Sequence, residues 1–500
     1  MKINHFPDEI RKYMIPEPDG RMFYRCLGCG KELGIDRILY TCPGCGSVLM
    51  LHDRNFEGRK EIGGDTWRRI FDYRKMLNLR ALKGIFLFYE FIAPVIPLDR
   101  IVYLGEGHTP IVEANGRLKE MVGTDFFFKN DGLNPSASFK DRGMACALSF
   151  INHFIKENRI KKILAVCAST GDTSAAAALY ASYLKDSLES AVLLPQGKVT
   201  PQQLSQPLGS GARVLEIPGV FDDCMKVVES IAENYHVALL NSKNSWRVLG
   251  QESFSFEISQ DFDYSVEDKA VVLPIGNAGN ITAVMNGFLK FYKAGITDGL
   301  PKIIGVQSEH ADPVYRYYLE GDPKKRKFTP VTVKPSVAQA AMIGNPVSMP
   351  RVIEIAEEYT RIAGKGKVLV VQVTEQEVMD SMIIANRNGN IACTQGGESL
   401  AGLKKAVKDG HVRKGDISIL DSTAHVLKFQ SFQEMYFNDN FGPEFNVSPK
   451  KELMNSPTLV KPQSLKKYPK PGKPLQGKDM KRFIEEMSSE IAGILKLEKK

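Results

Sequence analysis

One lysine in a short turn is the side chain of this sequence whose neighbours most suggest chemistry. Lys140 lies in a stretch that is rich in Asn, Ser and Ala (134–143), and small residues that favour a helix follow at once (144–150). A lysine that is removed from water has a lowered pKa, so its neutral amine can form a Schiff base with a carbonyl group. An ordinary surface charge is the alternative, and the turn alone does not decide between the two.

Three further turns, rich in glycine and hydroxyl groups, follow predicted strands. The turn at 168–174 precedes a predicted helix whose first N–H groups can hold a carboxylate or a phosphate. The turn at 276–280 has glycines that let the backbone approach an anion, but their spacing is not that of a dinucleotide-binding fingerprint. The turn at 421–425 offers hydroxyl groups. An amine, two turns that can bind an anion and a hydroxyl group together define a site for pyridoxal phosphate.

Two Cys-x-x-Cys pairs form a second candidate site near the N-terminus. The pairs are 12 residues apart, and a glycine follows each of them, as a tight turn around an ion requires. This spacing is typical of a zinc ribbon, and four thiolate ligands leave no open position, so the zinc would be structural. A redox dithiol and an iron site are the alternatives. The four predicted ligands are Cys26, Cys29, Cys42 and Cys45.

Composition is typical of a globular protein with more than one domain. The chain has 500 residues, of which 43% are hydrophobic and 25% charged, and its net charge is +8. This mild basicity does not indicate a nucleic-acid partner, because an anionic small substrate fits it equally well. The N-terminus has no signal-like apolar core, and the most apolar stretch (81–97) contains Lys83 and Glu90, which favours a buried helix over a membrane span. We expect a cytoplasmic protein without a membrane partner.

Short apolar runs alternate with helical segments from about residue 101 onward. Runs of this length that are rich in Val, Ile and Leu are typical of buried parallel strands, and the helices between them indicate βαβ units in an α/β fold. After about residue 438 the chain becomes polar and rich in Pro and Lys, which predicts a solvated tail that ends in a helix at 480–497. The predicted strands are 163–166, 190–194, 237–240, 270–274, 303–306, 368–373 and 417–420.

These motifs together resemble those of threonine synthases, which belong to the tryptophan-synthase-β-like group (fold type II) of pyridoxal phosphate enzymes. A four-cysteine ribbon also occurs in some members. The matching stretches follow one another in order along the chain, at 105–110, 134–143, 168–174, 241–251, 276–280, 343–348 and 422–429. The resemblance implies a type II fold with two α/β subdomains around parallel sheets, preceded by a small N-terminal zinc ribbon.

The same resemblance implies an order of domains along the chain. We expect a zinc ribbon at 1–55, a helical connecting segment at 56–100, and a catalytic domain at 101–438 whose smaller subdomain spans roughly 145–240. A polar tail (439–500) follows. We also expect a homodimer.

The resemblance assigns the cofactor site residue by residue. Lys140 would hold pyridoxal phosphate through a Schiff base and later act as the base, and Thr423 would hydrogen-bond the pyridine nitrogen, with Ser422 as the second candidate. Asp172 would face the phenolic oxygen of the cofactor, where many members carry Asn. Like charges at that place disfavour ionisation, so we expect an abnormal titration of the bound cofactor. The cofactor phosphate would be bound by Gly276, Asn277, Ala278, Gly279 and Asn280.

The resemblance also implies a substrate, O-phospho-L-homoserine, which threonine synthases convert with water to L-threonine and phosphate. A planar guanidinium suits a bidentate grip on a phosphate group. The residues implied for the substrate carboxylate are Ser169, Thr170 and Thr173, and those for its phosphate are Ser242 and Arg247, assisted by Arg142.

Two other functions are compatible with parts of the sequence. A related enzyme of the group, such as a cysteate synthase, would act on O-phosphoserine and sulfite and would need a shorter pocket, which the sequence does not reveal. A zinc-ribbon protein that binds nucleic acid and carries an inactive enzyme fold is opposed by the intact Lys140 and the intact phosphate loop, and the ribbon lacks a dense basic surface.

Overall fold

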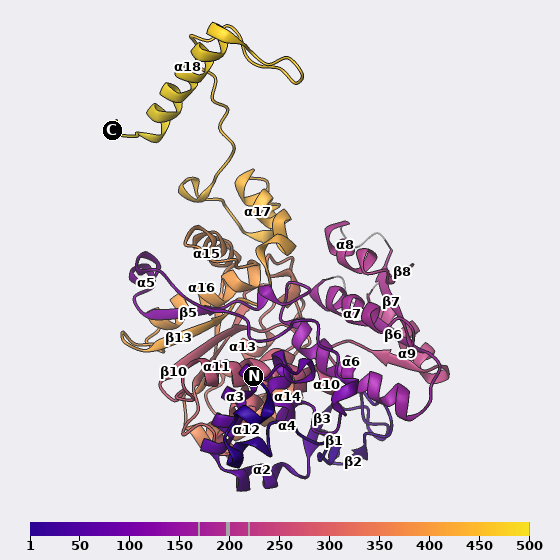
Figure 1. Cartoon of the computed structure of the whole chain (residues 1–500). Coiled ribbons are helices and arrows are strands. Elements are labelled where there is room, and N and C mark those ends of the chain that lie inside the picture. The colour runs from indigo at the N-terminus through magenta and orange to yellow at the C-terminus, as the bar shows by residue number, and fades with distance from the viewer. Residues whose placement is uncertain (169–170, 197–200, 219–220, 500) are drawn as a thin grey trace. The chain divides into compact units, whose positions relative to one another are not determined.

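The computed structural model describes residues 1–168, 171–196, 201–218 and 221–499 (Figure 1). The chain falls into two compact units, Met1–Lys450 and Lys451–Lys500. The first unit contains three separate sheets, two parallel or mixed and one antiparallel. No helix among these residues is long and apolar enough to cross a membrane.

The larger sheet has six strands in the order β12-β11-β10-β13-β5-β4. All neighbouring strands are parallel except the edge strand β4, which runs antiparallel to β5. Strand β10 is buried along its whole length, as its apolar sequence predicts, so the predicted parallel sheet is confirmed. The strands are β4 (Ile111–Glu113), β5 (Asp125–Lys129), β10 (Lys269–Pro274), β11 (Lys302–Ser308), β12 (Val368–Val373) and β13 (Ile417–Asp421).

Helices cover this sheet and share its core. Helices α12 (Gly279–Lys293) and α14 (Met349–Ala363) contribute to one hydrophobic cluster with β10 and β11. Helix α16 (Thr394–Lys408) packs across strands β10 to β13 and against α15 (Glu375–Arg387). The remaining helices beside it are α5 (Gly116–Val122), α11 (Ser253–Asp261), α13 (Pro313–Leu319) and α17 (Gln430–Phe437).

The smaller sheet has four parallel strands in the order β8-β7-β6-β9. Strands β6 (Ile163–Ala168), β7 (Leu188–Pro195) and β9 (Val237–Leu239) contain three of the predicted apolar runs. Strand β8 (Arg213–Ile217) was not predicted, because this edge strand buries none of its residues fully and carries Arg and Glu. The accompanying helices are α6 (Lys140–Glu157), α7 (Asp172–Tyr183), α8 (Pro201–Gly209), α9 (Phe221–Asn234) and α10 (Ser245–Gln251).

The third sheet is an N-terminal ribbon of three antiparallel strands, in the order β2-β1-β3. The two cysteine-containing turns have the predicted geometry, since Gly30 and Gly46 both adopt a φ of 73°, a left-handed conformation that favours glycine. The strands are β1 (Met22–Cys26), β2 (Glu32–Gly34) and β3 (Leu49–Asp53).

The apolar stretch at 81–97 is buried, but it is not the single helix that we predicted. It forms short 3₁₀ turns and one turn of α-helix, α4 (Tyr89–Ile92). Gly84 interrupts the helix with a φ of 56°, at a place where a Cβ would overlap the carbonyl oxygen of Glu106. The segment packs against helix α3 (Gly64–Met76), which follows α2 (Phe56–Ile62).

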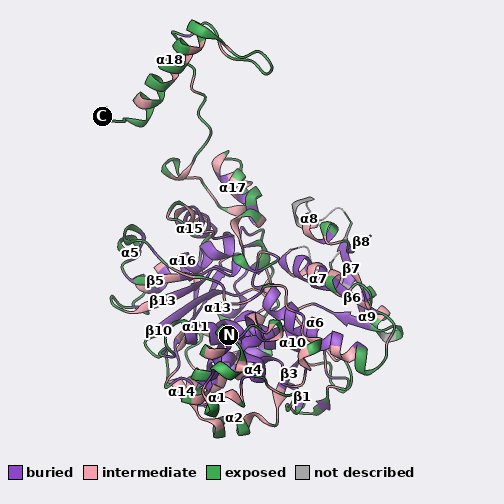
Figure 2. Cartoon of the chain, viewed as in Figure 1, coloured by how far each residue is buried: buried purple, intermediate pink, exposed green. Residues whose placement is uncertain are grey.

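The second unit is a short extended segment and a helix, α18 (Gly477–Leu495). The predicted terminal helix is therefore present, and Figure 2 shows it in exposed and intermediate colours only. Within this unit Tyr468 lies against Phe483, with 6.4 Å between the ring centres, and Lys467 pairs with Asp479.

Candidate functional site

The lysine turn is held at the carboxyl end of the larger sheet. Lys140 is the first residue of α6, and the turn before it is hydrogen bonded to the segment that follows β13. The bond runs from Phe139 N to Thr423 O and measures 2.8 Å. Two of the four predicted turns, 134–143 and 421–425, therefore lie side by side.

The surroundings of the Lys140 amine favour its neutral form. Burial lowers its pKa to about 8, and the nearby cation of Arg247 lowers it further, while Asp172 and Asp421 act in the opposite direction. The Nζ atom lies 4.1 Å from the centre of the Phe139 ring. The structure thus gives Lys140 the property that the sequence suggested, an amine that is partly neutral near pH 8.

Helices α6 and α10 approach each other closely because two glycines face the partner helix. A Cβ on Gly250 would overlap the carbonyl oxygen of Arg142, and a Cβ on Gly143 would lie 2.8 Å from the carbonyl oxygen of Arg247. This packing places Arg247 beside the helix that Lys140 begins.

Arg247 is a buried guanidinium whose charge has no counter-ion in the described part of the chain. Its side chain is 3% exposed, Nη1 donates to Leu240 O (3.2 Å), and Nε finds no hydrogen-bond partner among the described residues. Burial lowers its pKa to about 10. A buried cation with a free donor is stabilised by an anion, so Arg247 fits the predicted phosphate-binding role.

Asp172 is paired with a lysine that the sequence did not assign to the site. Asp172 begins α7 and is 5% exposed, and Lys428 Nζ lies 3.0 Å from its Oδ1 atom. Lys428 Nζ also donates to Ser136 O (2.9 Å), in the lysine turn. Lys428 thus joins two of the predicted turns to the segment after β13, and it neutralises the carboxylate that we expected beside the phenolic oxygen.

The predicted phosphate loop forms one turn between β10 and α12. Ala278 takes a left-handed φ of 61°, and no side chain of the described residues caps the N-terminus of α12. Uncapped N–H groups at a helix start fit a phosphate group. Gly276, Asn277 and Gly279 are partly exposed, whereas the buried Asn280 donates its side-chain N–H to Asp421 Oδ2 (2.7 Å).

Both hydroxyl candidates for the pyridine nitrogen are buried after β13. Thr423 Oγ1 lies 3.6 Å from Cys393 Sγ. Ser422 Oγ has no hydrogen-bond partner in the described residues. Two hydroxyl groups with spare hydrogen-bonding capacity therefore remain at this position, and the geometry does not single out Thr423.

Arg142 has a different place from the one that we predicted. Its side chain is 1% exposed and pairs with Asp131 (2.7 Å) and Glu257 (2.5 Å) inside the protein. These two carboxylates occupy the guanidinium, so we withdraw Arg142 from the proposed substrate-binding set. Its ion pairs anchor α6 from behind Lys140.

The remaining predicted substrate residues lie on two segments. Ser169 and Thr170 are outside the described residues, and Thr173 is half-buried in the first turn of α7. Ser242 is half-buried between β9 and α10, five residues before Arg247.

Arg351, in α14, is a residue that sequence reasoning missed. It is fully buried and donates to the carbonyl oxygens of Leu49 (2.6 Å), Ser242 (3.2 Å) and Lys243 (3.0 Å). It therefore holds the turn that contains Ser242. The position of Arg351 directly after the matched stretch 343–348 was the only signal in the sequence, and it does not distinguish a buried arginine from a surface one.

The four cysteines of the ribbon converge as their spacing predicted. Their Sγ atoms all lie within 4.8 Å of one another, with 3.4 Å between Cys26 and Cys45 and 3.7 Å between Cys29 and Cys42. Four sulfur atoms at such distances fit one tetrahedral ion.

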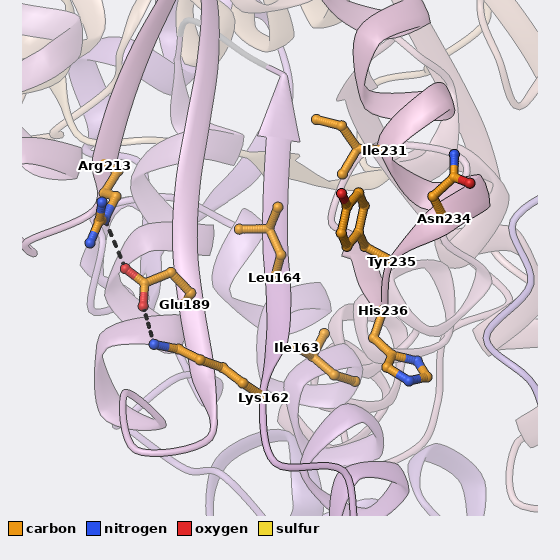
Figure 3. Close-up of a pocket in the computed structure, with 9 residues that line it drawn as sticks. All are labelled: Lys162, Ile163, Leu164, Glu189, Arg213, Ile231, Asn234, Tyr235 and His236. Carbon is orange, nitrogen blue, oxygen red and sulfur yellow. Dashed lines mark hydrogen bonds and ion pairs between the residues drawn. The ribbon is translucent and has the colours of Figure 1, made fainter.

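A cavity of about 990 Å³ lies elsewhere, at the amino-terminal edge of the smaller sheet (Figure 3). Glu189 bridges Lys162 (2.6 Å) and Arg213 (2.9 Å) across its rim. None of the predicted site residues that the structure describes lines it. Because the predicted turns follow the carboxyl ends of their strands, this cavity is separate from the lysine site.

The chain is similar to known proteins over most of its length. Residues 102–422, which include every strand of the two larger sheets, match the sequence model of the family "Pyridoxal-phosphate dependent enzyme". A threonine synthase of Methanocaldococcus jannaschii is 33% identical over 409 residues, which cover 81% of this chain and 93% of that protein. A chloroplastic threonine synthase 2 of Arabidopsis thaliana is 34% identical and covers 81% of this chain and 76% of its own.

A solved structure shares the fold. The crystal structure of threonine synthase from Escherichia coli superposes with a TM-score of 0.61 at 19% identity, and the match covers 83% of this chain and 91% of that one.

We predict that the protein without cofactor captures pyridoxal phosphate faster as the pH rises toward 8. Only the neutral amine reacts, and since the pKa of Lys140 is lowered to about 8, its neutral fraction grows about tenfold per pH unit below that value and then levels off. Stopped-flow absorbance in the visible range measures the rate. A rate that still climbs about tenfold per unit near pH 9 would indicate a lysine with an ordinary pKa and would contradict this reading.

Proposed function

The chain belongs to the family of pyridoxal-phosphate dependent enzymes, and we propose that within this family it is a threonine synthase. The reaction is the conversion of O-phospho-L-homoserine and water to L-threonine and phosphate. The similarity to threonine synthases over 81% of this chain supports the proposal. The observation that carries it is the buried guanidinium of Arg247 beside Lys140, which has no counter-ion among the described residues, because an amino acid with a phosphate ester would supply an anion.

The residues present fit the cofactor. The start of α12, which no described side chain caps, suits its phosphate, Lys140 offers the amine, and Thr423 or Ser422 offers a neutral hydroxyl to the pyridine nitrogen. When bound, pyridoxal phosphate supplies an electron sink for negative charge at the carbons next to the amino group. A neutral hydroxyl, unlike a carboxylate, leaves the pyridine nitrogen largely unprotonated and so moderates this sink.

In the proposed reaction Lys140 moves protons and Arg247 holds the leaving group. The neutral Lys140 amine removes the α-proton of the substrate, and a β-proton leaves next. Phosphate then departs from Cγ while Arg247 and Ser242 bind it. Protonation at Cγ, addition of hydroxide from water at Cβ and return of a proton to Cα complete the exchange. Thr173 and the turn before it would bind the substrate carboxylate.

We also propose that the four cysteines bind one structural zinc ion. Four thiolates fill a tetrahedral shell, so the ion would have no position for substrate. The cytoplasmic location and the homodimer are proposals that rest on the sequence alone.

The direct test measures phosphate release from O-phospho-L-homoserine and from O-phosphoserine side by side, with detection of threonine. We expect threonine and phosphate in equal amounts from the first substrate only. We expect the variant Lys140→Ala to lose both turnover and the visible band of the bound cofactor. Turnover of phosphoserine with sulfite in place of phosphohomoserine would instead identify a cysteate synthase.

A second prediction concerns Arg247. The variant Arg247→Met should raise the KM for O-phospho-L-homoserine about 10- to 100-fold, since it removes a charge-assisted grip on the phosphate group. Arg213→Met is the matched control, because Arg213 is exposed and bound to Glu189 on the smaller sheet. Steady-state kinetics on both variants provide the measurement, and equal KM values would remove Arg247 from the phosphate site.

A third prediction concerns the Asp172–Lys428 pair. The carboxylate favours the protonated form of the cofactor bound to Lys140, and the ammonium disfavours it. Asp172→Asn should therefore lower the pH midpoint of the visible absorbance band, and Lys428→Met should raise it. Spectrophotometric pH titrations of the two variants and the wild type test this. Identical titration curves for the three proteins would show that the Asp172–Lys428 pair does not influence protonation of the bound cofactor.

A further inference from the structure

The N-terminal ribbon is hydrogen bonded to both ends of the segment that carries the proposed phosphate site. Tyr40 OH accepts a hydrogen bond from Leu239 N (2.7 Å), at the end of β9. Tyr24 OH accepts one from Trp246 Nε1 (2.9 Å), at the start of α10. Segment 239–247, which contains Ser242 and ends with Arg247, is thus bracketed by two ribbon tyrosines.

A third contact connects the ribbon to the middle of the segment. The carbonyl oxygen of Leu49, in strand β3, accepts from Ser245 Oγ (2.8 Å) and from the Arg351 Nε and Nη2 atoms (2.9 and 2.6 Å). The same guanidinium donates to the carbonyl oxygens of Ser242 and Lys243. Arg351 is fully buried, so these carbonyl groups are its stabilising partners. The ribbon and the Ser242 turn therefore lie on two sides of one guanidinium.

The two tyrosines lie next to the cysteines in sequence. Tyr24 is two residues before Cys26 and Tyr40 two residues before Cys42, and both of these cysteines are 1% exposed. The ribbon has strands of only three to five residues, and such small sheets depend on their ion for a fixed structure. Loading of the four cysteines therefore fixes the positions of both hydroxyl groups.

We propose that the ion-loaded ribbon is a positioning element for the substrate phosphate, acting on Ser242 and Arg247 through Tyr24, Tyr40 and the Leu49–Arg351 contact. The inference rests on the proposed function, which makes these two residues the phosphate ligands. The proposed cofactor residues Lys140, Thr423 and 276–280 lie on other elements, so loss of the ribbon contacts weakens phosphate binding and leaves the cofactor in place.

The test compares the double variant Tyr24→Phe/Tyr40→Phe with Tyr359→Phe in the zinc-loaded, cofactor-bound protein. Tyr359 is a matched control, because it is a fully buried tyrosine whose OH donates to Pro301 O (2.7 Å), away from the ribbon. Calorimetric titration with inorganic phosphate gives a Kd, kinetics give KM and kcat, and thermal unfolding gives Tm. A second arm removes zinc with a chelator and restores it.

We expect the double variant to raise the phosphate Kd and the substrate KM about tenfold, with kcat and the visible cofactor band unchanged. Tyr359→Phe should lower Tm without changing the phosphate Kd or the substrate KM. Zinc removal should weaken phosphate binding in the same way, and zinc should restore it. If removal of zinc unfolds the protein, the phosphate Kd and substrate KM of the zinc-loaded double variant decide the test.

An unchanged phosphate Kd and KM in the double variant would overturn the inference, as would an equal effect of Tyr359→Phe. Failure of the proposed function has a different signature. One outcome is that the wild type forms no threonine while the phosphate Kd rises in the double variant and phosphate binding is lost in Arg247→Met. In that case the positioning role stands and the assigned reaction is wrong. If threonine is formed and the phosphate Kd does not respond, the positioning role alone falls.

Discussion

Two basic side chains, the half-buried Lys140 and the buried Arg247, lie at the same place, and much of the catalytic unit serves to keep them there. Gly143 and Gly250 let α6 and α10 pack closely enough to bring the two side chains together. Within the described chain no carboxylate pairs with Arg247, and its charge lowers the pKa of Lys140. Such an arrangement is costly for an isolated protein and becomes favourable when an anion binds, which is why it indicates a binding site rather than a structural ion pair.

Two other buried groups near this site, Arg142 and Asp172, are ion paired, and the contrast is informative. Arg142 is balanced by Asp131 and Glu257, and Asp172 is balanced by Lys428. These pairs hold α6, α7 and the segment after β13 in fixed positions around Lys140 and Arg247. Next to the ribbon, the buried guanidinium of Arg351 is also stabilised by fixed partners, which are carbonyl groups and not a carboxylate.

The sequence predicted what depends on local spacing. Seven of the ten strands of the two larger sheets, the cysteine cluster and the lysine turn were predicted, because each is set by residues that are close in the chain. Arg142 lies elsewhere than expected because successive helix residues are about 100° apart, so its side chain projects about 200° around α6 from Lys140 and pairs with Asp131 and Glu257. The roles of Arg351 and Lys428 depend on contacts between distant segments, which a single sequence does not reveal.

The central claim is that Lys140 is the amine that a buried site keeps reactive. Reduction of the cofactor-bound protein with borohydride, followed by peptide mass spectrometry, tests it most directly. The account predicts the reduced cofactor on Lys140. Lys428 is an alternative lysine beside the same turn, and its amine is engaged in an ion pair with Asp172. Cofactor found on Lys428, on another lysine or on none would contradict the account.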